Sequence, residues 1–120
     1  MKFMLLCYDD EQAWSRAGTA IHEAAMYEAV ALTHELNAKH QYIAASPLQS
    51  SPKAVSVRVR EGRPIVTDGP FAETREVLGG YYIIDVTSLD EAIEIAGRHP
   101  GVRVGTVEIR PLVELPGLPE

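Results

Sequence analysis

The sequence predicts an α+β protein with a ferredoxin-like fold of order β-α-β-β-β-α-β, in which an antiparallel sheet carries both helices on one face. Three observations favour it: an apolar run at residues 2–8, helical spacing of apolar residues between 20 and 39, and a second strand–helix–strand order from residue 77 onward. The chain has 120 residues, of which 46% are apolar and 23% charged, as in one globular domain. We place that domain at residues 1–112 and a C-terminal tail at 113–120.

The first half of the chain supplies a strand and a helix. Residues 2–8 form an unbroken apolar run that acidic residues end, which is typical of a central strand. Residues 9–19 are polar and mixed, and the helix is expected to begin after them. Its apolar stripe recurs at spacings of three and four residues and holds Ala25, Ala29, Leu32 and Leu36. A second, weaker apolar strip indicates a second neighbour for the helix and holds Met26, Val30 and Thr33.

A short strand near residues 41–44 and a turn-rich connection lead to a hairpin. Along residues 54–60 three valines alternate with polar residues, so we expect a half-buried strand with the valines on its inner face. Glu61-Gly62 forms a tight turn, and residues 64–67 are the returning strand.

The second half of the chain again has a strand, a helix and a strand. Residues 77–86 form a long strand in which Gly79-Gly80 indicates a bulge or a close approach. Ser88 and Glu91 form a capping box that opens the second helix. The inward residues of that helix are expected to be Ala92, Ile93 and Ala96. Residues 102–112 form the last strand.

The strand segment Tyr81-Tyr82-Ile83-Ile84 is apolar or aromatic on both faces. Helices cover only one face of a ferredoxin-like sheet, and the other face then needs a cover that 120 residues do not supply. We therefore expect a homodimer in which the open sheet faces pack together.

The charge and the cysteine content indicate which binding partners and which cellular compartment to expect. There are 11 basic and 17 acidic residues, a net charge of −6, and the basic residues are scattered singly, which argues against nucleic-acid and membrane surfaces. One cysteine, Cys7, excludes an internal disulfide and is expected to be a small buried hydrophobe. Acidic residues interrupt the apolar start before it reaches the length of a targeting segment, so we expect a cytoplasmic protein.

The densest motif lies at residues 68–76. Asp68-Gly69-Pro70 is turn chemistry, because the aspartate can bond backbone amides, glycine takes positive φ and proline fixes the exit. This corner is expected to carry Phe71 into the core. Glu73, Arg75 and Glu76 follow it, and they either frame a small polar pocket or form a solvated rim.

The sequence DGPFAETRE of residues 68–76, followed by LGGYYIIDV at 78–86 and GTVEIRP at 105–111, resembles the DGPF-domain proteins of the YCII-related family. The similarity spans most of the chain and implies a dimeric α+β barrel. It implies no settled reaction, and it implies a functional link to a sigma factor. In YCII-type proteins a histidine on the first helix and an aspartate before a proline are proposed as an acid–base dyad. The corresponding residues here are Ala29 and His99, so both members differ.

Two histidines are relevant to a site. His22 lies at the edge of the apolar stripe, near enough to the sheet to line a pocket. His99 ends the second helix, where the helix dipole favours a cationic imidazole, and this structural role competes with a catalytic one. The spacing of histidines and carboxylates predicts no metal site, and the absence of a glycine-rich phosphate loop predicts no cofactor.

Two functions remain open at the level of sequence. One is a small enzyme acting on a polar or carbonyl metabolite, with Asp68 or Glu73 as acid–base residue near His99 or His22. The other is a non-catalytic ligand-binding or regulatory subunit linked to transcription, and a purely structural dimer scaffold is a third reading. The catalytic candidates are Asp68 and His99. The ligand-binding candidates are His22, Arg58, Gly69, Pro70, Phe71, Glu73, Arg75 and Tyr81.

Overall fold

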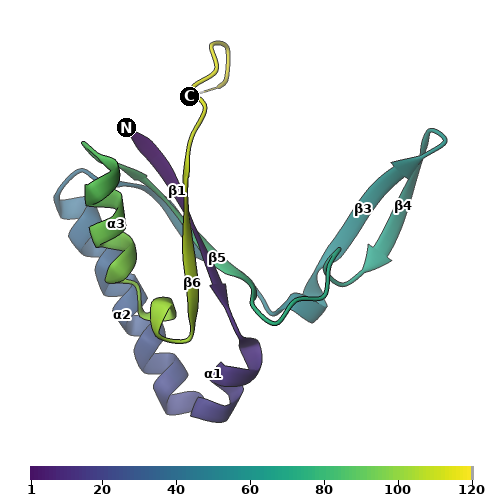
Figure 1. Ribbon diagram of the computed structural model, residues 1–120, viewed down its shortest axis with the longest axis horizontal. Helices are drawn as coiled ribbons and strands as arrows, with labels where there is room; N and C mark the ends of the chain where they lie inside the picture. Colours follow the sequence, from purple (N-terminus) through teal and green to yellow (C-terminus); the bar gives the residue numbers. More distant parts are fainter. Residues whose placement is uncertain (120) are drawn as a thin grey trace.

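The computed structural model describes residues 1–119. A four-stranded sheet has the order β2-β5-β1-β6, and β3 and β4 form a separate two-stranded sheet (Figure 1). The described strands are β1 (Lys2–Asp9), β2 (Tyr42–Pro47), β3 (Val55–Arg60), β4 (Arg63–Asp68), β5 (Val77–Asp85) and β6 (Gly105–Pro111). The helices are α1 (Glu11–Ala17), α2 (Thr19–Ala38) and α3 (Leu89–Gly97), with short 3₁₀ turns η1 (Ser51–Lys53) and η2 (Pro100–Arg103). All strand pairs are antiparallel, which confirms the predicted fold class.

The core lies between the four-stranded sheet and the helices α2 and α3. Strand β1 is central and pairs with both β5 and β6. Its alternate residues Phe3 and Leu5 are each 1% exposed and lie opposite Ile84 and Tyr82 of β5. Burial of such side chains removes about 25 cal/mol of unfavourable hydration per Å² and supplies most of the stability of the sheet–helix interface.

The helix ends follow local side-chain chemistry. Ser88 Oγ accepts a hydrogen bond from the Glu91 amide at 3.2 Å, which confirms the predicted start of α3. Helix α1 was not predicted; the Asp10 carboxylate caps it by accepting from the amides of Gln12 and Ala13.

The inward face of α3 differs from the prediction at one position. Ala92 and Ala96 are buried as expected, but Ile93 is 52% exposed and Ile95 is 1% exposed. Positions three and four residues after Ala92 share its face, and this spacing selects Ile95 rather than Ile93.

The hairpin of β3 and β4 stands away from the rest of the molecule (Figure 1). We call residues 55–68 the arm, and the four-stranded sheet with its three helices the body. The predicted tight turn is confirmed, with φ of 51° at Glu61 and 75° at Gly62. The prediction of a half-buried strand is wrong, because Val55, Val57 and Val59 are 60–68% exposed. The radius of gyration, 16.2 Å, exceeds the roughly 14 Å of a compact chain of this length.

The motif of residues 68–76 forms the base of the arm. The Gly69 amide donates to the Ala54 carbonyl at 2.7 Å, and Ser56 Oγ donates to the Gly69 carbonyl at 2.8 Å. Gly69 has a φ of 93°, as a left-handed turn residue should. The expectation that Phe71 enters the core is wrong: its side chain is 80% exposed, because the corner lies beyond the edge of the body.

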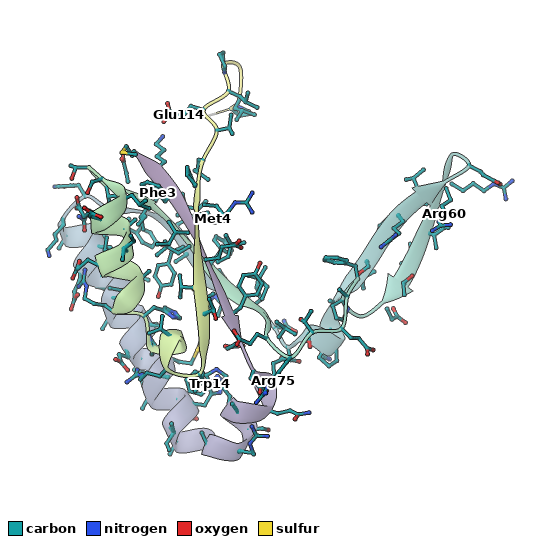
Figure 2. The ribbon with its side chains drawn as sticks, in the orientation of Figure 1. Phe3, Met4, Trp14, Arg60, Arg75 and Glu114 are labelled. Atoms are coloured by element: carbon teal, nitrogen blue, oxygen red, sulfur yellow. The ribbon has the colours of Figure 1, made fainter. Side chains whose placement is uncertain are left out.

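The sheet of the body has an open face opposite its helices. Figure 2 shows Phe3 on the helix side of β1 and Met4 on the side where the arm stands. The apolar residues of this open face are all partly exposed and comprise Met4, Leu6, Tyr8, Tyr81 and Ile83. Among residues 1–119, no helix combines the length and the apolar character that crossing a membrane would require.

Candidate functional site

A cavity of about 270 Å³ lies between α2 and the sheet. Helix α2 lines it with Ala25 and Ala29 of the first predicted apolar strip and with the whole of the second strip, and the sheet lines it with residues of β1, β2 and β5. The second strip, Met26, Val30 and Thr33, therefore borders the cavity, with strand β2 on the opposite wall. Most of the lining is apolar, and its ionisable side chains are those of Cys7, Asp9, His22, Tyr42, Tyr82 and His99. Tyr81 also borders the cavity, from a position on β5 whose side chain lies on the open face of the sheet.

Asp9 lies at the end of β1 and points to the helix side of the sheet, since it continues the alternation of Phe3, Leu5 and Cys7. The Trp14 Nε1–H donates to Asp9 Oδ2 at 2.9 Å. Burial raises the pKa of the Asp9 carboxyl, and the hydrogen bond from Trp14 partly opposes that rise. The carboxyl thus keeps its proton to higher pH than an exposed aspartate does, in a largely apolar surrounding.

A glycine makes room for this carboxyl. A Cβ atom at Gly79 would lie 3.1 Å from both Asp9 oxygens, closer than nearly all real Cβ contacts. The sequence predicted a bulge or a close approach at the double glycine. The close approach occurs at Gly79, where the Asp9 carboxylate lies against the backbone. The bulge is present as well, in the pairing of β1 with β5 between Cys7 and Tyr8.

His22 packs on the same side of the cavity. Its ring lies 5.2 Å from the Trp14 ring, tilted by 40°. Its charge contributes a smaller lowering to the pKa of Asp9. Asp9, Trp14 and His22 also border an adjoining, more polar hollow that extends to Gln49 and Ser50. The three side chains form a cluster where the apolar cavity meets this polar extension.

His99 lies deeper, next to Tyr82. The two rings are 5.3 Å apart and nearly perpendicular, at 82°. His99 Nδ1 accepts a hydrogen bond from the Gly101 amide at 3.0 Å and so caps η2. Burial lowers the pKa of His99, which outweighs the opposite effect of Glu28. The imidazole is therefore neutral at pH 7 with its proton on Nε2, which corrects the expectation of a cation.

Cys7 and Tyr82 on the inner wall both hold their protons more tightly than usual. Burial raises the pKa of the Cys7 thiol to about 12, so Cys7 is a poor nucleophile. Burial also raises the pKa of Tyr82, whose hydroxyl donates to the Ala29 carbonyl at 3.1 Å.

Three of the predicted site residues, His22, Tyr81 and His99, line the cavity. The other seven lie on the arm or at its base and do not border it: Arg58, Asp68, Gly69, Pro70, Phe71, Glu73 and Arg75. Of the charges after the corner, Arg75 is 86% exposed and pairs with Asp10 at 3.3 Å. It also borders a small polar hollow with Glu11, Arg16 and Ser51, so both readings for these charges stay open.

Sequence reasoning missed Asp9 and Trp14. The signal for Asp9 was available, because a period of two from Phe3 places it on the buried face of a central strand. No comparable signal marked Trp14, whose position depends on the unpredicted helix α1. Within residues 1–119, no group of three or more histidine, cysteine, aspartate or glutamate side chains is arranged to hold a metal ion.

Comparison with known proteins gives a family, a sequence relative and a structural relative. Residues 1–116 match the model of the YCII-related domain. The uncharacterised protein R00369 of Rhizobium meliloti (strain 1021) is 35% identical over 114 residues, covering 93% of this chain and 92% of that protein. The structure of 5-chloro-2-hydroxyhydroquinone dehydrochlorinase (TftG) from Burkholderia phenoliruptrix AC1100, in complex with 2,5-dihydroxybenzoquinone, covers 94% of each chain with a TM-score of 0.55 and 12% identity. At that identity the likeness shows the shared fold.

Proposed function

The chain belongs to the YCII-related domain family, and from this premise we propose that it is an enzyme that transfers protons on a small ring-shaped ligand, with Asp9 as its acid–base residue. The observation that carries the proposal is the Asp9 carboxyl, which has a raised pKa in an apolar cavity and is oriented by Trp14. Acid–base residues are tuned in this way, by burial and by a fixed hydrogen bond.

The two oxygens of Asp9 have different surroundings. Oδ2 accepts from Trp14, and among residues 1–119 no hydrogen bond to Oδ1 is present. Oδ1 is then the atom that exchanges protons with a ligand carbon. The protonated carboxyl adds its proton to a ring carbon beside an enolate oxygen: the C=C electrons form the new C–H bond, and the enolate becomes a carbonyl. The carboxylate then removes a proton from this sp3 carbon, the electrons of the C–H bond restore the enolate, and the cycle completes an exchange or an isomerisation.

His99 is suited to donate a hydrogen bond to the ligand oxygen that gains negative charge. Its Nδ1 is occupied by the Gly101 amide, and Nε2–H is the donor that remains for a ligand. Asp9 lies four residues along β1 from Leu5, which pairs with Tyr82 beside His99. At about 3.3 Å per residue, the backbone positions of Leu5 and Asp9 are roughly 13 Å apart along β1, and a ring bound between Asp9 and His99 would lie along this length.

The size and lining of the cavity support a ring-shaped ligand. A largely apolar space of about 270 Å³ suits a small flat molecule with oxygen substituents at its edges. The printed title of the TftG structure names such a compound, 2,5-dihydroxybenzoquinone, as the ligand of that protein. This likeness supports the ligand class by analogy of fold.

The test uses 2,5-dihydroxybenzoquinone as the probe. NMR in deuterated buffer measures the exchange of its ring C–H with solvent, with and without the protein. We expect the protein to accelerate the exchange and Asp9→Asn to lower that acceleration about 100-fold or more, as for loss of a general base. The matched control Asp90→Asn, on the exposed first turn of α3, should leave it unchanged.

Two outcomes would contradict the proposal. Equal exchange by wild type and Asp9→Asn would remove Asp9 from the chemistry. Binding of the probe, seen as a thermal shift, without accelerated exchange would instead favour the ligand-binding or regulatory reading.

A homodimer is the second part of the proposal. The open sheet face carries five partly exposed apolar residues, and a second copy packed on it would bury them. Membership of a family with a dimeric α+β barrel fold supports the same arrangement.

A further inference from the structure

The arm has one apolar face, and that face is exposed. The register of the hairpin places Val57 opposite Val66 and Val59 opposite Pro64, so the valines of both strands share a face. Val55, Val57, Val59 and Val66 are each at least 60% exposed. A two-stranded hairpin is marginally stable by itself and needs packing on one face to hold its shape. The arm therefore has an apolar face that is suited to a partner.

The arm and the open sheet face lie on the same side of the molecule. Figure 1 shows α2 and α3 on one side of the sheet and the arm extending from the other side. The arm and the open sheet face therefore border the same space. One partner placed there is within reach of both apolar surfaces.

The charges favour a second copy of this chain as that partner. The arm has three arginines and two acidic residues, a net charge of +1. The whole chain has 11 basic and 17 acidic residues, so the rest of it has 8 basic and 15 acidic, a net charge of −7. Among residues 1–119, Arg58, Arg60 and Arg63 take part in no ion pair within 4 Å. These arginines lie on the face of the hairpin opposite the valines, so they surround the apolar contact and do not enter it. A basic arm and an acidic body attract each other at longer range between copies.

We propose that the arm is an exchanged dimerisation element: the arm of each copy closes over the body of the other, while their open sheet faces pack together. Each copy has one arm and one open face, so a two-fold pair covers every such surface and the assembly ends at two. The inference rests on the homodimer proposed above, but not on the proton-transfer activity. It gives the long insertion between β2 and β5 a role in holding the partner.

The test compares dimer dissociation constants, measured by sedimentation velocity, for matched variants. Val57→Glu places a charge on the apolar face of the arm, and Thr67→Glu places the same charge on its opposite face. An armless variant joins Ala54 to Gly69 through two glycines, which the 2.7 Å hydrogen bond between those residues makes feasible. We expect Val57→Glu and the armless protein to weaken the dimer about tenfold or more, and Thr67→Glu to leave it nearly unchanged.

Circular dichroism and thermal unfolding establish that each variant is folded. A wild-type monomer at about 10 µM would overturn both the dimer and the arm exchange. A dimer whose dissociation constant is the same in all variants would overturn the proposed exchange of arms between copies. The pairing of the open sheet faces would remain possible. A photo-crosslinker at Val57 gives a further test: the expected product joins two copies, and a product within one chain or only to a different protein would contradict the proposal.

Discussion

Alternating apolar residues are buried in the strands of the body but exposed in the strands of the arm. In the body, β1 alternates buried apolar residues with partly exposed ones, and every buried residue contacts a helix or a neighbouring strand. In the arm, β3 alternates valines with polar residues in a similar pattern, but the valines are exposed. Alternation therefore identifies a strand with two unlike faces, and tertiary context decides whether the apolar face is covered within the same chain.

The two phenylalanines of the chain give the largest expected difference between these regions. Phe3 is 1% exposed in the core of the body, and Phe71 is 80% exposed at the base of the arm. Phe3→Ala should lower the free energy of unfolding by about 3–5 kcal/mol, because it removes buried contacts and leaves a cavity. Phe71→Ala should change it by less than about 0.5 kcal/mol.

Denaturant unfolding measures the free energy of unfolding of both variants. The protein concentration is kept below the dimer dissociation constant, so that the monomer is compared. A cost at Phe71 close to that at Phe3 would show that the arm base is buried in solution. It would also remove the contrast between arm and body on which the proposed exchange of arms between copies depends.

Gly79→Ala gives the next largest effect and tests the body alone. The added Cβ would lie 3.1 Å from the Asp9 oxygens, so the carboxyl must move away from Trp14. We expect a loss of about 1–3 kcal/mol in the free energy of unfolding, as for overpacking, and a loss of the exchange activity. Gly97→Ala is the matched control, since nothing lies within 4 Å of the Cβ it would add. Full activity in Gly79→Ala would show that the position of Asp9 is unimportant.

Much of the fold could be predicted because local chemistry decides it. Ser88 begins a helix wherever its hydroxyl can meet the amide of Glu91, and the alternation along residues 2–8 needs no distant information. The burial of Phe71 and of the arm valines could not be predicted, since it depends on where the hairpin stands relative to the body. The turn chemistry at the corner favoured a site near Asp68 in the sequence-based prediction. The cavity is instead formed by α2 and by residues that meet it only in the folded chain, such as Asp9 and His99.

The smallest expected effect concerns the pH dependence of stability, and it separates the chemistry of Asp9 from its structural cost. Burial raises the pKa of Asp9 in the folded state above its unfolded value. The folded protein then binds the proton more tightly than the unfolded chain, so this group stabilises the fold less as pH rises through the interval between the two pKa values. Above the folded pKa the full cost of the buried charge is present.

Asp9→Asn removes that titration while keeping an oxygen that can accept from Trp14. The free energy of unfolding of the variant, minus that of wild type, should increase from about pH 4 upward and become constant above the folded pKa of Asp9. Any pH-independent effect of the amide cancels in this slope. Asp90→Asn should show no such rise, because Asp90 is exposed. A variant that gains stability at neutral pH while losing proton exchange would show that the body retains a costly buried charge for its function. A difference in the free energy of unfolding that does not change with pH would mean that Asp9 is solvated like the charges of the arm. The contrast between the two regions would then not extend to their ionisable groups.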